Sequence, residues 1–157
     1  MTLGVKTKGF LIVCSCILIS VYISSCTRNE LDLPKYDNKE CYYSDGVGDY
    51  IDFSKYYYNS ESISDFNNYP KFKMVSQSDI ANIKAYFEDF ELWVVNQEYY
   101  DKYDFNKDIQ INEGDFCYIE TDDESDTGDP HFDKFHDYKV YYADVESCIL
   151  YYIYVHY

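Results

Sequence analysis

Residues 138–155 read YKVYYADVESCILYYIYV, and aromatic and β-branched side chains, which favour extended backbone, dominate both halves of this stretch. Between the halves, Asp144-Val145-Glu146-Ser147 has the polar composition of a turn. The pattern therefore predicts two strands, 138–143 and 148–155, joined by this turn. The second half is apolar or aromatic throughout, which is typical of a central strand covered on both faces of its sheet.

A second pair of strands is predicted directly upstream. Residues 108–111 and 116–121 both alternate between polar and apolar side chains, which is the period of a half-buried strand. Residues 112–115 between them, Asn-Glu-Gly-Asp, are typical of a turn, so we expect a hairpin. Residues 50–75 are aromatic but irregular, and they fit either a short helix or an edge strand.

Residues 76–94 carry the pattern of an amphipathic helix, for which Ser76 or Ser78 provides a cap. Asp79 follows in the first turn, where negative charge suits the helix dipole. Apolar side chains then recur at helical spacing, at Ile80, Ile83, Phe87, Phe90 and Val94. The opposite face is polar, with Asn82, Lys84, Glu88 and Asp89. The predicted fold class is therefore α+β, with one main amphipathic helix packed on a small antiparallel sheet of about four strands.

The N-terminal segment has the order of a secretory signal peptide. Lys6 and Lys8 lie in an end without acidic residues, an apolar run follows over residues 10–23, and small residues come next. The apolar run is shorter than the roughly 20 residues that a helix needs to span a bilayer. We expect residues 1–25 to be removed as a signal peptide, and an uncleaved membrane anchor is the alternative.

The segment Ile23-Ser24-Ser25-Cys26 resembles the lipobox of bacterial lipoproteins, in which an aliphatic residue and two small ones precede a cysteine. The resemblance implies that Cys26 becomes the lipidated N-terminus, with several acyl chains such as palmitate that hold the protein durably at a membrane. Thr27 follows in place of aspartate, which by the same resemblance implies the outer membrane, facing the periplasm, in a Gram-negative host. The resemblance covers the export segment alone.

The mature chain divides into a tether and one domain. Residues 26–49 are polar and show no sustained period, so we expect the lipidated cysteine and a flexible tether there. Residues 50–157 are enough for a single α+β domain with its own core.

The charge and the aromatic content of the chain after Cys26 indicate which kind of partner it binds. All 29 acidic residues follow Cys26, against 11 of the 13 lysines and arginines, which gives the mature chain a net charge of about −18. Such a surface repels nucleic acid and attracts basic proteins. Twenty of the 21 tyrosines also follow Cys26, and tyrosine provides either strand packing or a recognition surface.

Three cysteines remain in the mature domain, Cys41, Cys117 and Cys148. An odd number in an oxidising compartment allows at most one internal disulfide, and the spacings leave the pair open.

One stretch resembles the calcium loop of EF-hands and dockerins, with oxygen ligands at Asp104, Asn106, Asp108 and Asp115. Ile109 stands where these families place glycine, and Asp115 is shorter than their usual bidentate glutamate. The alternation around Ile109 favours the hairpin instead. We therefore predict no metal site, and Ca²⁺ is the weak alternative there and in the acidic run 122–130.

No pattern of catalytic residues is present. His131, His136 and His156 lack the spacing of a metal motif, and the chain has no nucleophile elbow, phosphate loop or dinucleotide fingerprint. Zinc held by a histidine with Cys117 or Cys148 is the remaining alternative. We expect neither an enzyme nor a small-molecule substrate, and the covalent lipid on Cys26 is the one attached group.

The profile is that of a binding module in the cell envelope. A small, acidic, exported domain without catalytic residues resembles in profile the immunity proteins and inhibitors that neutralise a basic periplasmic toxin or wall hydrolase. We expect the partner to contact the densest acidic run, at Asp122, Asp123, Glu124, Asp126 and Asp129. The alternatives are an accessory or structural lipoprotein of an envelope assembly, and a weak calcium-binding surface protein.

Overall fold

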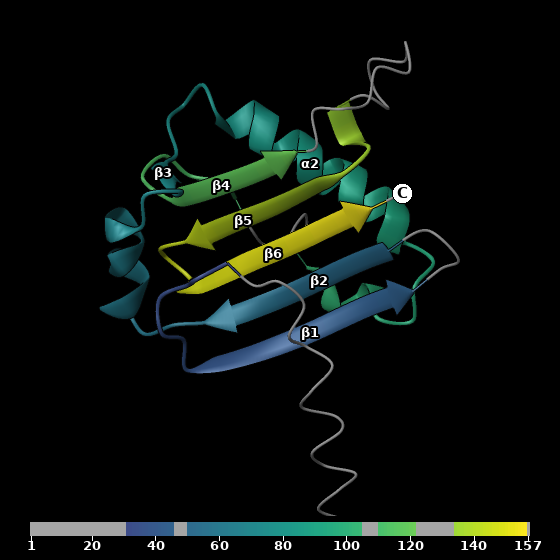
Figure 1. Cartoon of the computed structure of the whole chain (residues 1–157), viewed down its shortest axis with the longest axis horizontal. Coiled ribbons are helices and arrows are strands. Elements are labelled where there is room, and N and C mark those ends of the chain that lie inside the picture. Colours follow the sequence, from purple (N-terminus) through teal and green to yellow (C-terminus); the bar gives the residue numbers. More distant parts are fainter. Residues whose placement is uncertain (1–30, 46–49, 105–109, 122–133, 157) are drawn as a thin grey trace, which may run out of the picture. The chain divides into compact units, whose positions relative to one another are not determined.

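The computed structural model describes residues 31–45, 50–104, 110–121 and 134–156. Within these ranges, antiparallel strands form one sheet in the order β1-β2-β6-β5-β4-β3 (Figure 1). The strands are β1 (Asn38–Asp45), β2 (Tyr50–Tyr57), β3 (Lys73–Met74), β4 (Phe116–Thr121), β5 (Tyr138–Asp144) and β6 (Ile149–His156). One α-helix, α2 (Ile80–Val94), and two short 3-10 helices, η2 (Ser62–Asn68) and η3 (Tyr100–Lys102), complete the described elements.

The strand β6 lies at the centre of the sheet, between β2 and β5. Successive residues of a strand point to opposite faces, so Leu150 and Ile153, three positions apart, lie on different faces of the sheet. Both side chains are fully buried, and both faces of β6 are therefore covered. The predicted turn between β5 and β6 is confirmed, because the Asp144 carboxylate accepts hydrogen bonds from the backbone N–H groups of Glu146 and Ser147. The sequence prediction of a central strand is confirmed.

The helix α2 covers one face of the sheet, behind the strands in Figure 1. Ile83, Phe87, Phe90 and Val94 of its apolar stripe are buried, as predicted. Asp79 occupies the capping position in place of Ser76 or Ser78, and hydrogen bonds from Ser76 lower the pKa of its carboxyl. The α+β class is therefore confirmed, with a larger sheet than the predicted four strands.

Asp89 lies inside the core, and its predicted place on the polar face of α2 is wrong. Its side chain is 6% exposed, and the Tyr138 hydroxyl donates a hydrogen bond of 2.8 Å to Asp89 Oδ2. A buried carboxylate needs such donors, because burial without a partner costs several kcal/mol. The helical pattern alone could not show that β5 places a tyrosine opposite this position.

The N-terminal strands differ from the sequence prediction. Residues 38–45, expected to lie in the flexible tether, form the edge strand β1, and β2 lies inside the sheet between β1 and β6. Lys55 interrupts the apolar pattern of β2, but its side chain is 8% exposed and its Nζ lies 2.7 Å from Asp104 Oδ2. Asp104, which is distant in the sequence, neutralises Lys55 and so allows a charged residue at a buried strand position. The sequence pattern of β2 therefore does not indicate that this position is buried.

The predicted hairpin of residues 108–111 with 116–121 is wrong in its pairing. Gln110 and Ile111 are not in a strand, and β4 pairs instead with β3, where Lys73 lies opposite Cys117 and Met74 opposite Phe116. The turn before β4 does form, and Gly114 takes a φ of 97° there. The Val75 backbone N–H donates to Asp115 O, and the Gly114 N–H donates to Val75 O.

Two further findings concern the cysteines and the membrane. No disulfide joins Cys41, Cys117 and Cys148, and burial raises the pKa of the Cys117 thiol.

No helix in the described part of the chain is long and apolar enough to cross a membrane. The signal segment, Cys26 and the acidic run 122–130 lie outside the described residues, so their predictions stay predictions.

Candidate functional site

The face of the sheet opposite α2 is covered at one end by aromatic side chains. Phe66 of η2 lies 4.6 Å from Phe72, measured between ring centroids, and Phe72 meets Tyr141 of β5 at 6.2 Å. Tyr141 in turn contacts Tyr118 at 5.8 Å and Tyr152 at 4.7 Å. This aromatic cluster anchors η2 and leaves the other end of the same face to solvent.

At that other end, a row of side chains crosses the sheet. The strand registers place Tyr43 opposite Asp52, Asp52 opposite Tyr154, Tyr154 opposite Lys139, and Lys139 opposite Glu120. Residues opposite one another in an antiparallel sheet point to the same face, so all five form one surface. We call this set, Tyr43, Asp52, Tyr154, Lys139 and Glu120, the polar row.

Tyrosine rings give the polar row its apolar contact area. Tyr43 is 49% exposed, and the ring of Tyr154 lies 5.4 Å from that of Tyr50 on the adjacent strand. The Tyr50 hydroxyl donates a hydrogen bond of 3.2 Å to Asp52 Oδ2. Two of these tyrosines are therefore held in place by neighbours on the sheet, with their rings partly open to solvent.

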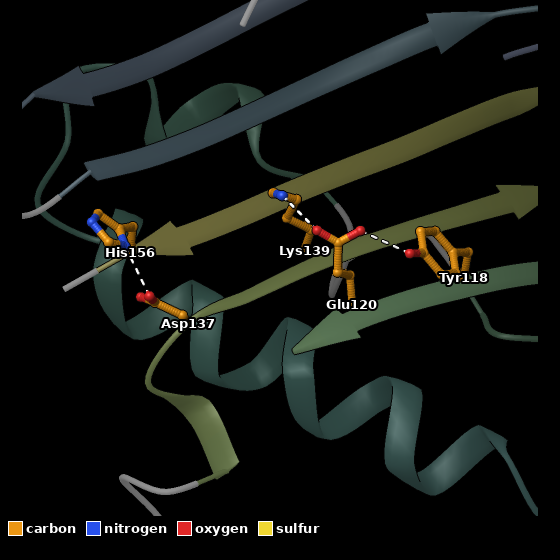
Figure 2. A network of polar contacts seen from close by, with 5 residues as sticks. All are labelled: Tyr118, Glu120, Asp137, Lys139 and His156. Carbon is orange, nitrogen blue, oxygen red and sulfur yellow. Dashed lines mark hydrogen bonds and ion pairs between the residues drawn. The ribbon is translucent and has the colours of Figure 1, made fainter. Parts of the chain in front are cut away.

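Glu120 is the centre of a hydrogen-bond network (Figure 2). Lys139 Nζ donates to Glu120 Oε1 at 2.6 Å, and the Tyr118 hydroxyl donates to Oε2 at 2.7 Å. These two bonds lower the pKa of the Glu120 carboxyl, so the carboxylate is ionised at neutral pH. Burial, together with the bond to Glu120, raises the pKa of Tyr118 to about 12. Lys139 Nζ also lies 5.3 Å from the centroid of the Tyr154 ring.

A second acidic group lies beside this network. Asp137 Oδ2 lies 2.9 Å from Nδ1 of His156, at the end of β6, and Figure 2 shows the pair next to Glu120 and Lys139. His136 Nδ1 is 3.8 Å from the other Asp137 oxygen. A shallow pocket of about 250 Å³ opens here, lined by Glu120, Thr121, Asp137, Tyr138, Lys139 and Tyr154. Its walls include two carboxylates, the ring of Tyr154 and the ammonium group of Lys139. Carboxylates and an aromatic ring are groups that suit a cationic side chain.

Of the four residues that resemble a calcium loop, the structure describes Asp104 and Asp115, and both stabilise the fold. Asp104 pairs with the buried Lys55. Asp115 is 4% exposed, and its carboxylate accepts hydrogen bonds from the Tyr142 hydroxyl and from the backbone N–H of Val145. Asn106 and Asp108 lie outside the described residues. In the part of the chain that the structure describes, no group of three His, Cys, Asp or Glu side chains is placed to hold a metal ion.

The predicted partner-binding residues, Asp122, Asp123, Glu124, Asp126 and Asp129, also lie outside the described residues. The polar row was not predicted from the sequence. The sequence of each strand does contain a polar residue or a tyrosine at this position, for example Lys139 in β5 and Tyr154 in β6. The register that aligns these positions across the sheet is a long-range property that no local pattern contains.

Comparisons of the chain with models of protein families, with curated proteins and with solved structures found no match. The class of the site therefore follows from its geometry, which is an open, tyrosine-bearing and partly acidic sheet face.

Proposed function

We propose that the protein is an exported lipoprotein, anchored by lipid on Cys26, whose acidic domain binds a basic protein of the cell envelope. The partner that fits best is a periplasm-acting toxin or a cationic wall hydrolase, which the lipoprotein neutralises as an immunity protein or inhibitor. One observation carries this proposal: the mature chain has a net charge of about −18 and also a sheet face with one exposed tyrosine, Tyr43, and two half-buried ones, Tyr50 and Tyr154.

The two halves of this observation supply different parts of a binding free energy. A strongly negative surface attracts a positive partner at a distance and raises the association rate. Tyrosine rings on a rigid sheet bury a large area at low entropy cost, which slows dissociation.

Retention of a cationic protein from envelope extract tests the proposal. We expect the immobilised lipoprotein to retain at least one basic protein at low salt and to release most of it at high salt, because salt screens exposed charges. Mass spectrometry identifies the retained protein, and an immobilised lipoprotein of similar size and weak charge is the control. Retention of a stoichiometric envelope protein that is not basic would support the accessory role instead. If no cationic protein is retained even at low salt, the proposal fails.

A further inference from the structure

We infer that the polar row and the pocket beside it form the partner-binding surface, and that the pocket receives an arginine or lysine side chain of the basic partner. This inference rests on the proposed function and names the surface that performs it. It differs from the sequence prediction, which placed the contact in the acidic run 122–129.

Charge at this end of the sheet favours a cation. The polar row and the pocket present the carboxylates of Asp52, Glu120 and Asp137. Lys139 pairs with Glu120, and Lys71, whose Nζ lies 5.2 Å from the Tyr118 ring, also acts on Glu120. The local excess of negative charge is therefore small, and the net charge of about −18 of the mature chain adds to the attraction of a cation. The Glu120 side chain is 43% exposed, so an approaching cation reaches it without displacing the core. Each carboxylate has about four acceptor positions, so oxygens that already accept one bond can accept another.

The chain itself shows how a cation is held there. Lys139 Nζ lies 2.6 Å from Glu120 Oε1 and 5.3 Å from the centroid of the Tyr154 ring. A carboxylate and a ring face thus hold an ammonium group between two strands of the open face. A guanidinium group offers five donors and a planar face, which suit the same carboxylate and ring together with Asp137 on the pocket wall. Lys139 is then an internal competitor for the site that the partner uses.

The shape of the surface fits a folded partner. The pocket is shallow, and the tyrosines Tyr43, Tyr50 and Tyr154 extend from it along the sheet. A small organic ligand is better enclosed by a deep apolar cavity, whereas a protein surface needs a broad area around one anchoring side chain. The occupant that matches is therefore a basic protein with an exposed arginine or lysine.

Binding of an oligo-arginine peptide to the detergent-solubilised lipoprotein tests this surface. The double variant Glu120→Gln with Asp137→Asn is expected to weaken the Kd for the peptide about tenfold, since it removes two charge-assisted hydrogen bonds. The matched control is Glu88→Gln with Glu98→Gln, which removes the same charge at exposed positions in and just after α2. The control is expected to weaken binding by about twofold, the effect of overall charge alone.

A second pair of variants separates the site from a purely structural role. Lys139→Gln removes the internal competitor, so we expect it to tighten peptide binding several-fold. Lys84→Gln is its matched control, because Lys84 forms an exposed pair with Glu88 at 3.3 Å on the helix. Lys84→Gln changes the net charge equally and is expected to tighten binding only slightly. Thermal melting of all variants checks that each one is folded.

The outcomes distinguish this inference from the proposed function. If the two double variants weaken binding equally, and Lys139→Gln behaves like Lys84→Gln, attraction is diffuse and the inference is overturned, while the proposed function stands. If the wild-type protein binds oligo-arginine no better than a matched oligo-citrulline peptide, recognition of basic groups fails altogether. That result overturns the proposed function as well.

Discussion

Phe87→Ala is expected to lower the free energy of unfolding by about 3–5 kcal/mol, a large share of the stability of a small domain. Phe87 is fully buried on α2, and its ring meets that of Tyr142 on β5 edge to face at 6.1 Å. Truncation to alanine removes this contact and leaves a cavity between helix and sheet, which a packed core fills only in part. Chemical denaturation monitored by circular dichroism measures the change.

Leu92→Ala is the matched control for this variant. Leu92 lies on the same helix but is 71% exposed, so its truncation is expected to change the free energy of unfolding by less than about 0.5 kcal/mol. Equal stability of Phe87→Ala and the wild type would mean that α2 does not pack on the sheet through this stripe.

Cys26→Ser is expected to abolish lipid labelling and membrane fractionation completely. In the proposed lipoprotein the lipid is attached to the thiol of this residue, and a serine hydroxyl is a much weaker nucleophile than a thiolate. The domain itself should still fold, because the first strand of the described residues begins at Asn38, twelve residues after Cys26. Metabolic labelling with a fatty acid, followed by membrane flotation, measures both effects.

Cys41→Ser is the control for the anchor, since this half-buried cysteine of β1 lies in the same part of the chain. Its lipid labelling should equal that of the wild type. Recovery of wild-type protein with an intact Met1 and without acyl mass on Cys26 would contradict the lipoprotein prediction.

The elements that the sequence predicted correctly are those with a local signal. The apolar stripe of α2 repeats at helical spacing, and the segment of β6 is apolar or aromatic throughout. Both patterns can be recognised from neighbouring residues alone, without knowledge of tertiary contacts. The turn between β5 and β6 was also visible, because Asp144 supplies the acceptor that such a turn needs.

The elements that the sequence could not reveal depend on distant partners. β2 contains Lys55, whose burial makes sense only once Asp104 is placed beside it. β4 pairs with β3 across the whole of α2, and a two-residue strand has too few positions to show a period. Local alternation at residues 108–111 therefore predicted the wrong neighbour for β4.

The candidate site was missed for the same reason. Glu120, Lys139 and Tyr154 are unremarkable in their own strands, and only the registers of three strands bring them together. The sequence did indicate the sign of the charge and the abundance of tyrosine, which are bulk properties. It indicated the acidic run 122–129 as the contact, whereas the described residues bring carboxylates, tyrosines and Lys139 together on one sheet face.

The central claim is that the negative charge of the domain speeds association with a basic protein, and that contacts with tyrosine rings slow its dissociation. The measurement that tests it most directly is the association rate constant with the retained cationic protein over a series of salt concentrations. We predict that this rate falls steeply as salt rises, while the dissociation rate changes little, because salt screens long-range attraction more than buried contacts. An association rate that does not change with salt would contradict the claim.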